Sequence, residues 1–77
     1  MARIAVYGQP GCVQCRATEK KLGQLGVDFD YYDVSVDRDA LSFVLGLGYK
    51  QAPVVVCGSE HFSGYNPDGL RRFAGVV

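Results

Sequence analysis

The sequence PGCVQC, at Pro10–Cys15, lies between a short apolar run and a run with helical periodicity. Two cysteines spaced this way at the start of a helix lie on one side of a single turn. Their Cα atoms are then about 5.5 Å apart, which suits a disulfide. A helix N-terminus carries roughly half a positive charge and unpaired N–H groups, and both favour a thiolate on the first cysteine. The stretch therefore predicts a reversible dithiol/disulfide centre.

The segments on either side of this stretch are typical of a strand and a helix. Residues 3–7 (RIAVY) are short, apolar and partly β-branched, so we expect a central strand buried on both faces. From Val13 onward, apolar residues recur at helical intervals, and Gly26 is a natural stop. The expected apolar positions of this helix are Val13, Ala17, Leu22 and Leu25. Cys12 then falls where the strand ends and the helix begins, the place where open α/β sheets bind ligands.

The middle of the chain predicts a second strand and a second helix. Residues 29–34 (FDYYDV) are aromatic-rich and partly alternating, as in a strand. Asp37 is the expected N-cap of a helix that ends near residues 46–48. The apolar positions of that helix are Ala40, Leu41, Val44 and Leu45.

The last third predicts a β-hairpin and a final helix. Pro53 opens a strand over 53–57, and Gly58-Ser59 makes a two-residue turn with glycine first. Residues 60–63 (EHFS) return as a short, polar edge strand. Residues 66–68 (NPD) start a helix with a cap, an N1 proline and an acidic first turn. Its expected apolar face is Leu70, Phe73, Ala74 and Val77.

The element order is therefore βαβαββα, which predicts an α/β fold in a single domain over residues 1–77. The first two strands would be parallel, joined by a right-handed crossover, and the hairpin would supply the antiparallel half. Helices would cover both faces of this four-stranded mixed sheet.

Composition narrows the class of protein. Eight basic and eight acidic residues give a formal charge of zero, which does not favour nucleic acid or a membrane surface as a partner. The N-terminal residues lack the apolar region and cleavage site of a signal peptide, and no apolar run approaches a membrane span, so we expect a cytoplasmic protein. Three cysteines make a poor disulfide framework. In a reducing compartment, a C-x-x-C pair is more often catalytic or metal-binding than structural.

The redox interpretation divides the labour between the two thiols. Cys12, more exposed and better stabilised as an anion, would attack a substrate disulfide, and the more buried Cys15 would resolve the mixed disulfide. A Cys₃His zinc site made of Cys12, Cys15, Cys57 and His61 is the alternative. The long separation between its two halves disfavours it, because the residues between them predict a strand and a helix of their own. Alternation predicts a buried Cys57 and a solvent-facing His61.

Other residues near the dithiol remain open in function. Pro53 is either an ordinary strand opener or a cis-proline, and the sequence does not fix the isomer. Tyr7, Tyr49 and Tyr65 are either packing or platform aromatics. Gly64 lies ahead of a helix, where backbone N–H groups could receive a carboxylate or a peptide segment, or it simply makes a turn.

Three blocks of this sequence together resemble the NrdH-redoxins. The first is Tyr7-x-x-Pro10-x-Cys12-Val13-Gln14-Cys15 followed by Ala17-Thr18, the second is residues 47–55 (LGYKQAPVV), and the third is residues 61–68 (HFSGYNPD). They occur in the family's order and spacing over nearly the whole chain.

The resemblance implies the thioredoxin fold and a thiol-disulfide oxidoreductase. It implies no bound cofactor, and electrons that come from NADPH through thioredoxin reductase and pass to the large subunit of class Ib ribonucleotide reductase. It also implies a monomer. Cys12 corresponds to the nucleophile, Cys15 to the resolving thiol and Ala52-Pro53 to a cis-proline loop that pairs with the substrate backbone. The other positions implied at the docking surface are Val13, Gln14, Ser63, Gly64 and Tyr65, with Tyr7 and Pro10 as possible support.

The departures from the family pattern concern the charge beside Cys12 and the hydrogen bonds of the third block. A lysine often precedes the active-site proline, and here that position is Gln9, so one cation beside Cys12 is missing. The third block usually has a tryptophan and an arginine where this chain has Phe62 and Asn66, so the network attributed to that pair cannot form as usual. The alternative function is that of a glutathione-dependent glutaredoxin. The uncharged Gln9 weakens this alternative, and Asp68 at a helix start keeps it open.

Overall fold

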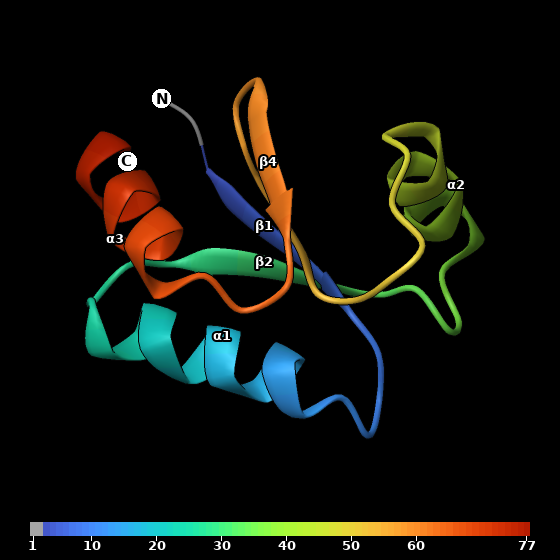
Figure 1. The fold of residues 1–77 in the computed structure, drawn as a ribbon, viewed down its shortest axis with the longest axis horizontal. Coiled ribbons are helices and arrows are strands. Elements are labelled where there is room, and N and C mark those ends of the chain that lie inside the picture. Colours follow the sequence, from blue (N-terminus) through green and yellow to red (C-terminus); the bar gives the residue numbers. More distant parts are fainter. Residues whose placement is uncertain (1–2) are drawn as a thin grey trace.

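A computed structural model describes residues 3–77 and contains one mixed sheet with helices on both faces (Figure 1). Its elements are β1 (Ile4–Gly8), α1 (Val13–Gln24), β2 (Phe29–Asp33), α2 (Arg38–Gly46), β3 (Val54–Cys57), β4 (Glu60–Ser63) and α3 (Pro67–Val76). The predicted βαβαββα order is confirmed, and the bounds differ from the expected ones by a residue or so. The arrangement is the thioredoxin fold.

The strand order β2-β1-β3-β4 puts β1 inside the sheet and β4 at an edge. β1 pairs with β2 in parallel, with Val6 opposite Tyr31, and with β3 antiparallel, with Ile4 opposite Cys57. The hairpin turn at Gly58 has a φ of 62°, a left-handed conformation that glycine adopts without steric cost. Both the parallel pair and the glycine-first hairpin follow the prediction.

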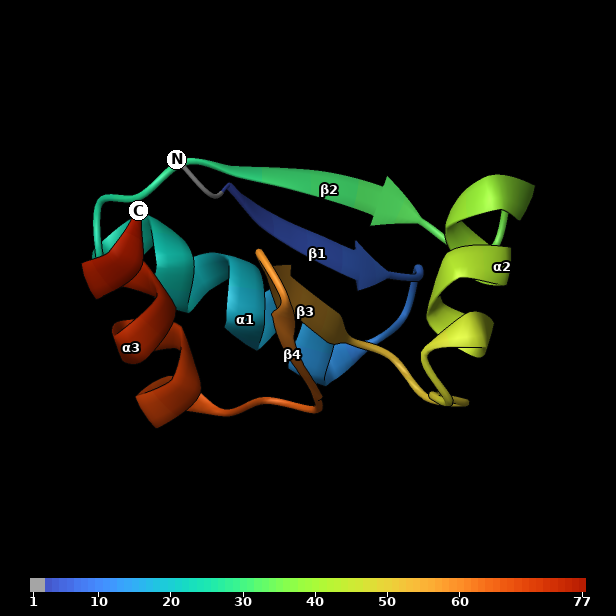
Figure 2. The ribbon, with the colours of Figure 1, turned by 90° about the horizontal axis from the view of Figure 1, so that it is seen from above.

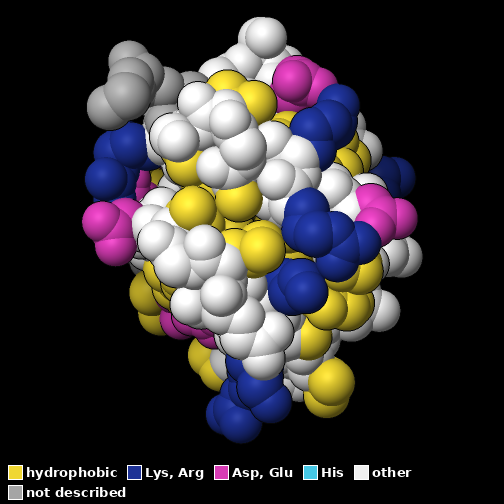
Figure 3. Space-filling model, turned by 90° about the vertical axis from the view of Figure 1, so that its left-hand side faces the viewer, with side chains coloured by type: hydrophobic (Ala, Val, Ile, Leu, Met, Phe, Trp, Pro, Cys, Tyr) yellow, Lys and Arg dark blue, Asp and Glu magenta, His cyan; other side chains and the backbone are white. Residues whose placement is uncertain are grey.

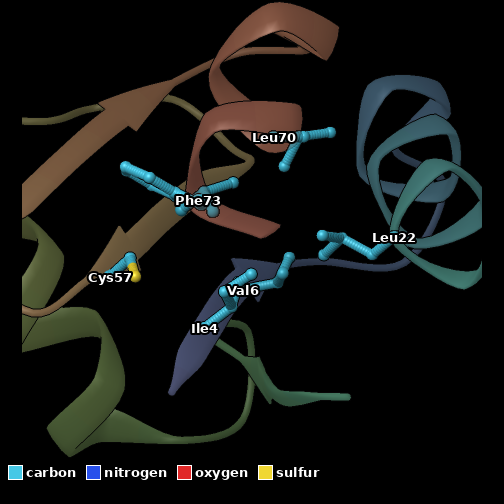
Figure 4. Packing of buried hydrophobic residues seen from close by; sticks show 7 residues of the cluster. Ile4, Val6, Leu22, Cys57, Leu70 and Phe73 are labelled. Carbon is cyan, nitrogen blue, oxygen red and sulfur yellow. The ribbon is translucent and has the colours of Figure 1, made fainter. Parts of the chain in front are cut away.

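The main core lies between the sheet and the pair of helices α1 and α3 (Figures 2 and 4). Side chains from β1, α1 and α3 converge there. The fully or nearly buried members of this core are Ile4, Val6, Leu22, Val55, Cys57, Leu70 and Phe73. α2 lies against the opposite face near the carboxyl ends of β1 and β2 (Figure 2).

The expected burial patterns of β1 and α1 are wrong. β1 is not fully buried on both faces, because Ala5 and Tyr7 face the side that only α2 covers and stay partly exposed. The buried line of α1 is Cys15, Thr18 and Leu22 rather than the line through Val13 and Ala17. Val13 is 81% exposed because it lies two residues before Cys15, on the opposite side of the helix from this buried line. Thr18 is buried without penalty, since its hydroxyl donates to Gln14 O at 2.9 Å.

The other helix starts follow the predicted caps. Asp37 Oδ1 accepts from Ala40 N at 3.0 Å, and Asn66 Oδ1 accepts from Gly69 N at 3.0 Å. The apolar faces are narrower than predicted: α2 buries only Ala40 and Val44, and α3 buries Leu70 and Phe73. The expected apolar positions left partly or largely exposed are Leu41, Leu45, Ala74 and Val77.

The charged surface is mixed. On the face viewed from the α3 side, basic and acidic side chains alternate with apolar and neutral ones (Figure 3). Within residues 3–77, every helix is too short or too polar to cross a bilayer.

Candidate active site

The dithiol lies at the strand-to-helix junction that the sequence predicted. Gly11, with a φ of 74°, turns the chain between β1 and α1, and Cys12 is the N-cap of the helix. Cys15 N donates to Cys12 Sγ at 3.1 Å, and Arg16 N donates to Cys12 O at 3.2 Å. The first-turn N–H group therefore points at the sulfur of Cys12, the arrangement that stabilises a thiolate at a helix start.

The two cysteines differ in their access to solvent. They form a disulfide with a Cα–Cα separation of 5.2 Å. Cys15 is only 1% exposed, whereas Cys12 is partly exposed and lines a surface groove. Of the two, Cys12 is therefore the one accessible to a second protein's disulfide, and the nucleophile and resolving roles stay predictions.

The groove beside Cys12 is built by two segments distant in sequence. From the active-site turn come Gln9, Cys12, Val13 and Gln14, and from the loop before β3 come Lys50, Gln51 and Ala52. The Ala52–Pro53 peptide bond is cis, which the sequence left open. Pro53 is buried, and its carbonyl accepts from Gly64 N at 2.9 Å. Pro10, at the start of the turn, is exposed.

The Ser63–Tyr65 segment is tied to both of these segments. Tyr65 N donates to Gln14 Oε1 at 3.2 Å, across 51 residues of sequence. A Cβ on Gly64 would lie 3.5 Å from the same oxygen, and the φ of 85° at Gly64 favours glycine. The backbone N–H groups of Gly64 and Tyr65 are thus engaged within the chain. They brace the surface around Cys12, so of the two interpretations left open for Gly64 the structure favours the turn, and neither N–H group is free to receive a carboxylate.

The three tyrosines singled out in the sequence have different positions. Tyr7 stacks on Tyr32 at 5.0 Å and contacts Phe43 at 5.3 Å, so it packs under α2. Burial raises the pKa of Tyr7, with Tyr32, Asp37 and Asp30 adding to the shift. Tyr49 is hydrogen-bonded through its hydroxyl to a histidine, and Tyr65 is exposed beside the dithiol surface.

The four residues of the zinc alternative are not brought together. Cys57 pairs with Ile4 at the start of β1, whereas Cys12 follows the end of that strand. His61 Nδ1 lies 2.6 Å from Tyr49 Oη on the exposed edge. Cys57 is buried as expected, and burial raises the pKa of its thiol, with a smaller contribution from Glu60. Residues 3–77 bring together no cluster of metal-ligating side chains.

The departures in the third block have a packing role. Phe62 packs on Phe73 with ring centroids 5.2 Å apart, and Asn66 caps α3. Gly69 permits both contacts, since a Cβ there would lie 2.7 Å from the Phe62 ring and 2.9 Å from Asn66 Nδ2. Phe62 therefore joins β4 to α3 through a tilted ring contact, and Asn66 caps the start of that helix.

Sequence reasoning missed the Tyr49–His61 bond and the Gln14–Tyr65 bond. Neither has a signal in the spacing of residues, because each joins segments that only the folded sheet brings together.

The family follows from comparison with known proteins. The sequence model for the glutaredoxins matches residues 4–62, which include the dithiol, the cis-proline loop and most of the hairpin. The chain belongs to the glutaredoxin family. It is 36% identical over 70 residues to the glutaredoxin-like protein NrdH of Escherichia coli, covering 91% of this chain and 86% of that protein. It is 38% identical over 71 residues to the gene 56 protein of Mycobacterium phage L5, covering 90% of this chain and 69% of that protein.

A solved structure of a family member has the same architecture. The NrdH-redoxin from Escherichia coli, a glutaredoxin-like protein with a thioredoxin-like activity profile, superposes with a TM-score of 0.87. It is 36% identical, and the match covers 91% of this chain and 92% of the other. This glutaredoxin is therefore of the NrdH type, a redox protein whose paired cysteines fit thiol-disulfide oxidoreductase activity.

Proposed function

We propose that this glutaredoxin is a dithiol electron donor for class Ib ribonucleotide reductase, with the large subunit as its disulfide substrate. In this proposal it is reduced by thioredoxin reductase with electrons from NADPH, binds no cofactor of its own and works as a monomer in the cytoplasm. The NrdH relatives and the thioredoxin-like activity profile of the Escherichia coli protein support this choice within the family.

The observation that carries the proposal is the contrast between Cys12 and Cys15. The Cys12 thiolate attacks one sulfur of the substrate disulfide, forms a mixed disulfide and releases the first substrate thiol. The Cys15 thiolate then attacks the sulfur of Cys12, closes the intramolecular disulfide and releases the second thiol. Two electrons have moved to the substrate. The 5.2 Å Cα separation allows this closure without movement of the helix backbone.

The surface around Cys12 suits a protein segment as substrate. Val13 presents an exposed apolar side chain next to the nucleophile, and Tyr65 presents an aromatic one. The bonds from Tyr65 N to Gln14 and from Gly64 N to Pro53 hold this surface together before a partner arrives. A preorganised surface of this kind reduces the entropy lost on docking.

Glutathione competes as a reductant, and its use would make the chain a glutathione-dependent glutaredoxin. Among the described residues that line the groove beside Cys12, Lys50 is the single cation, and Gln9 in the same lining is uncharged. Glutathione, a tripeptide with two carboxylates, therefore gains little electrostatic attraction in this groove.

The proposal is tested by a coupled assay of NADPH consumption. The electron acceptor is the class Ib ribonucleotide reductase, supplied with its own substrate. The electron source is thioredoxin reductase in one arm and glutathione with glutathione reductase in the other. We expect turnover in the first arm that is lost with Cys12→Ser. Turnover only in the glutathione arm would favour the glutaredoxin alternative, and turnover in neither would refute both.

A further inference from the structure

The last residue of β1, Gly8, leaves a gap beneath the first turn of α1. Gly8 is buried on the sheet face that α1 covers. A Cβ built there would lie 3.0 Å from Cys15 Sγ, 2.6 Å from Tyr31 Oη and 3.1 Å from Tyr31 Cε2. Cys15 Sγ and Tyr31 Oη therefore both lie close to the position that a side chain at residue 8 would occupy. Because Gly8 has no side chain, both atoms fit there.

Tyr31 reaches this point from the neighbouring strand. β2 runs parallel to β1, with Tyr31 beside Val6, and α1 packs against β1. The adjacent Tyr32 faces the other side of the sheet, where it stacks on Tyr7. Tyr31 is 40% exposed, while its hydroxyl lies over Gly8.

Cys15 needs a hydrogen-bond donor when it acts. It is almost fully buried, so its thiolate loses water, and desolvation disfavours the anion. The charged groups that act on Tyr31 are Glu19 from α1 and Asp33 from β2, and as carboxylates they accept rather than donate. Burial first, and then these two carboxylates, raise the pKa of Tyr31, so the phenol keeps its proton at neutral pH.

We propose that the Tyr31 hydroxyl donates a hydrogen bond to the Cys15 thiolate and thereby speeds the resolving step. The Cys15 thiol loses its proton to water, its thiolate attacks Cys12 Sγ in the mixed disulfide, and the substrate sulfur leaves as a thiolate. Tyr31 keeps its proton throughout. In the reverse direction an external thiolate attacks Cys12, and the same bond stabilises Cys15 as the leaving group. This role rests on the dithiol chemistry proposed above, but not on which protein is the partner.

The test is a stopped-flow reaction of the reduced protein with the chromogenic disulfide dithiobis(nitrobenzoate). Cys12 releases one thionitrobenzoate as it forms the mixed disulfide, and Cys15 releases the second as it closes the ring. We expect Tyr31→Phe to slow the second phase by about threefold near neutral pH, because the loss of one hydrogen bond lowers the thiolate fraction about tenfold, while the more basic thiolate is about threefold more nucleophilic. The pH midpoint of that phase should rise by about one unit, and the first phase should keep its rate.

Tyr32→Phe is the matched control, because it removes a hydroxyl from the adjacent residue on the opposite face. It should leave both phases unchanged. An equal second phase in Tyr31→Phe and Tyr32→Phe would overturn the role of Tyr31. Absence of the second phase in the unmodified protein would instead refute the dithiol mechanism itself, so the two failures are distinguishable. Phenylalanine keeps the ring that lies over Gly8, and a thermal melt of each variant confirms that the comparison is between folded proteins.

Discussion

Gly8→Ala should destabilise the oxidised protein, although alanine is normally the better residue in a strand. Replacing glycine in a regular element typically gains about 0.5–1 kcal/mol. Here the new methyl would meet Tyr31 Oη at 2.6 Å and Cys15 Sγ at 3.0 Å. Tyr31 can rotate away because its ring is partly exposed, but the sulfur of Cys15 is fixed by the disulfide.

The net cost follows from these opposing effects. Overpacking a buried site costs about 1–3 kcal/mol, so the oxidised protein should lose about 1–2 kcal/mol after the gain from alanine is subtracted. A domain of this size shifts its Tm by about 4–8 °C per kcal/mol, so the melt should move down by roughly that amount or more. The loss should be smaller in the reduced protein, where the Cys15 thiol can turn.

The assay is thermal and urea unfolding of the oxidised and reduced forms, with Gly23→Ala in α1 as the control. A Cβ on Gly23 has no neighbour within 4 Å, so that variant should gain stability in both forms. A Gly8→Ala variant as stable as Gly23→Ala, with equal effects in both redox states, would refute the close packing of Gly8, Cys15 and Tyr31.

Three further predictions concern the cap, the buried thiol and an exposed ion pair. Asn66→Ala removes the acceptor for Gly69 N and should lower the free energy of unfolding by about 1 kcal/mol in urea titrations, while Asn66→Asp should retain most of it. Cys57 should resist alkylation in the folded, reduced protein near neutral pH, because burial raises its pKa; mass spectrometry after brief iodoacetamide treatment should find label on Cys12 but none on Cys57, and rapid labelling of Cys57 would contradict its burial. The hydrogen bond from Arg3 lowers the pKa of Asp30, so this pair contributes stability that is present above the unfolded-state pKa of the carboxyl and is lost as pH falls through the folded-state pKa. Asp30→Asn should therefore flatten the acid side of the stability–pH profile slightly, and high salt should remove the difference because the pair is exposed.

The sequence predicted the elements well because their signals are local. Glycine stops, the Asp37 and Asn66 caps and the apolar run before Cys57 each act within a few residues, and the structure confirms them. The C-x-x-C spacing likewise predicts the short Cα–Cα distance of the dithiol, because that distance depends on one helical turn and not on tertiary contacts.

The parts that the sequence could not predict depend on contacts between distant segments. Val13 looked like a core position because it is apolar and lies at the helix start, but the side of α1 that meets the sheet is the opposite one, through Cys15 and Leu22. The hydrogen bond between Gln14 and Tyr65 joins segments that only the folded sheet brings together. Tyr31 and Cys15 both lie close to Gly8 because of the strand register and because residue 8 has no side chain. Each of these contacts determines the surroundings of the dithiol.

The most direct test of the central claim is a trapped mixed disulfide. Cys15→Ser leaves Cys12 able to attack but removes the thiol that resolves the intermediate. Incubated with the oxidised large subunit of class Ib ribonucleotide reductase, this variant should form a covalent complex whose disulfide mass spectrometry assigns to Cys12, and dithiothreitol should release it. No complex, or one joined through Cys57, would contradict the account.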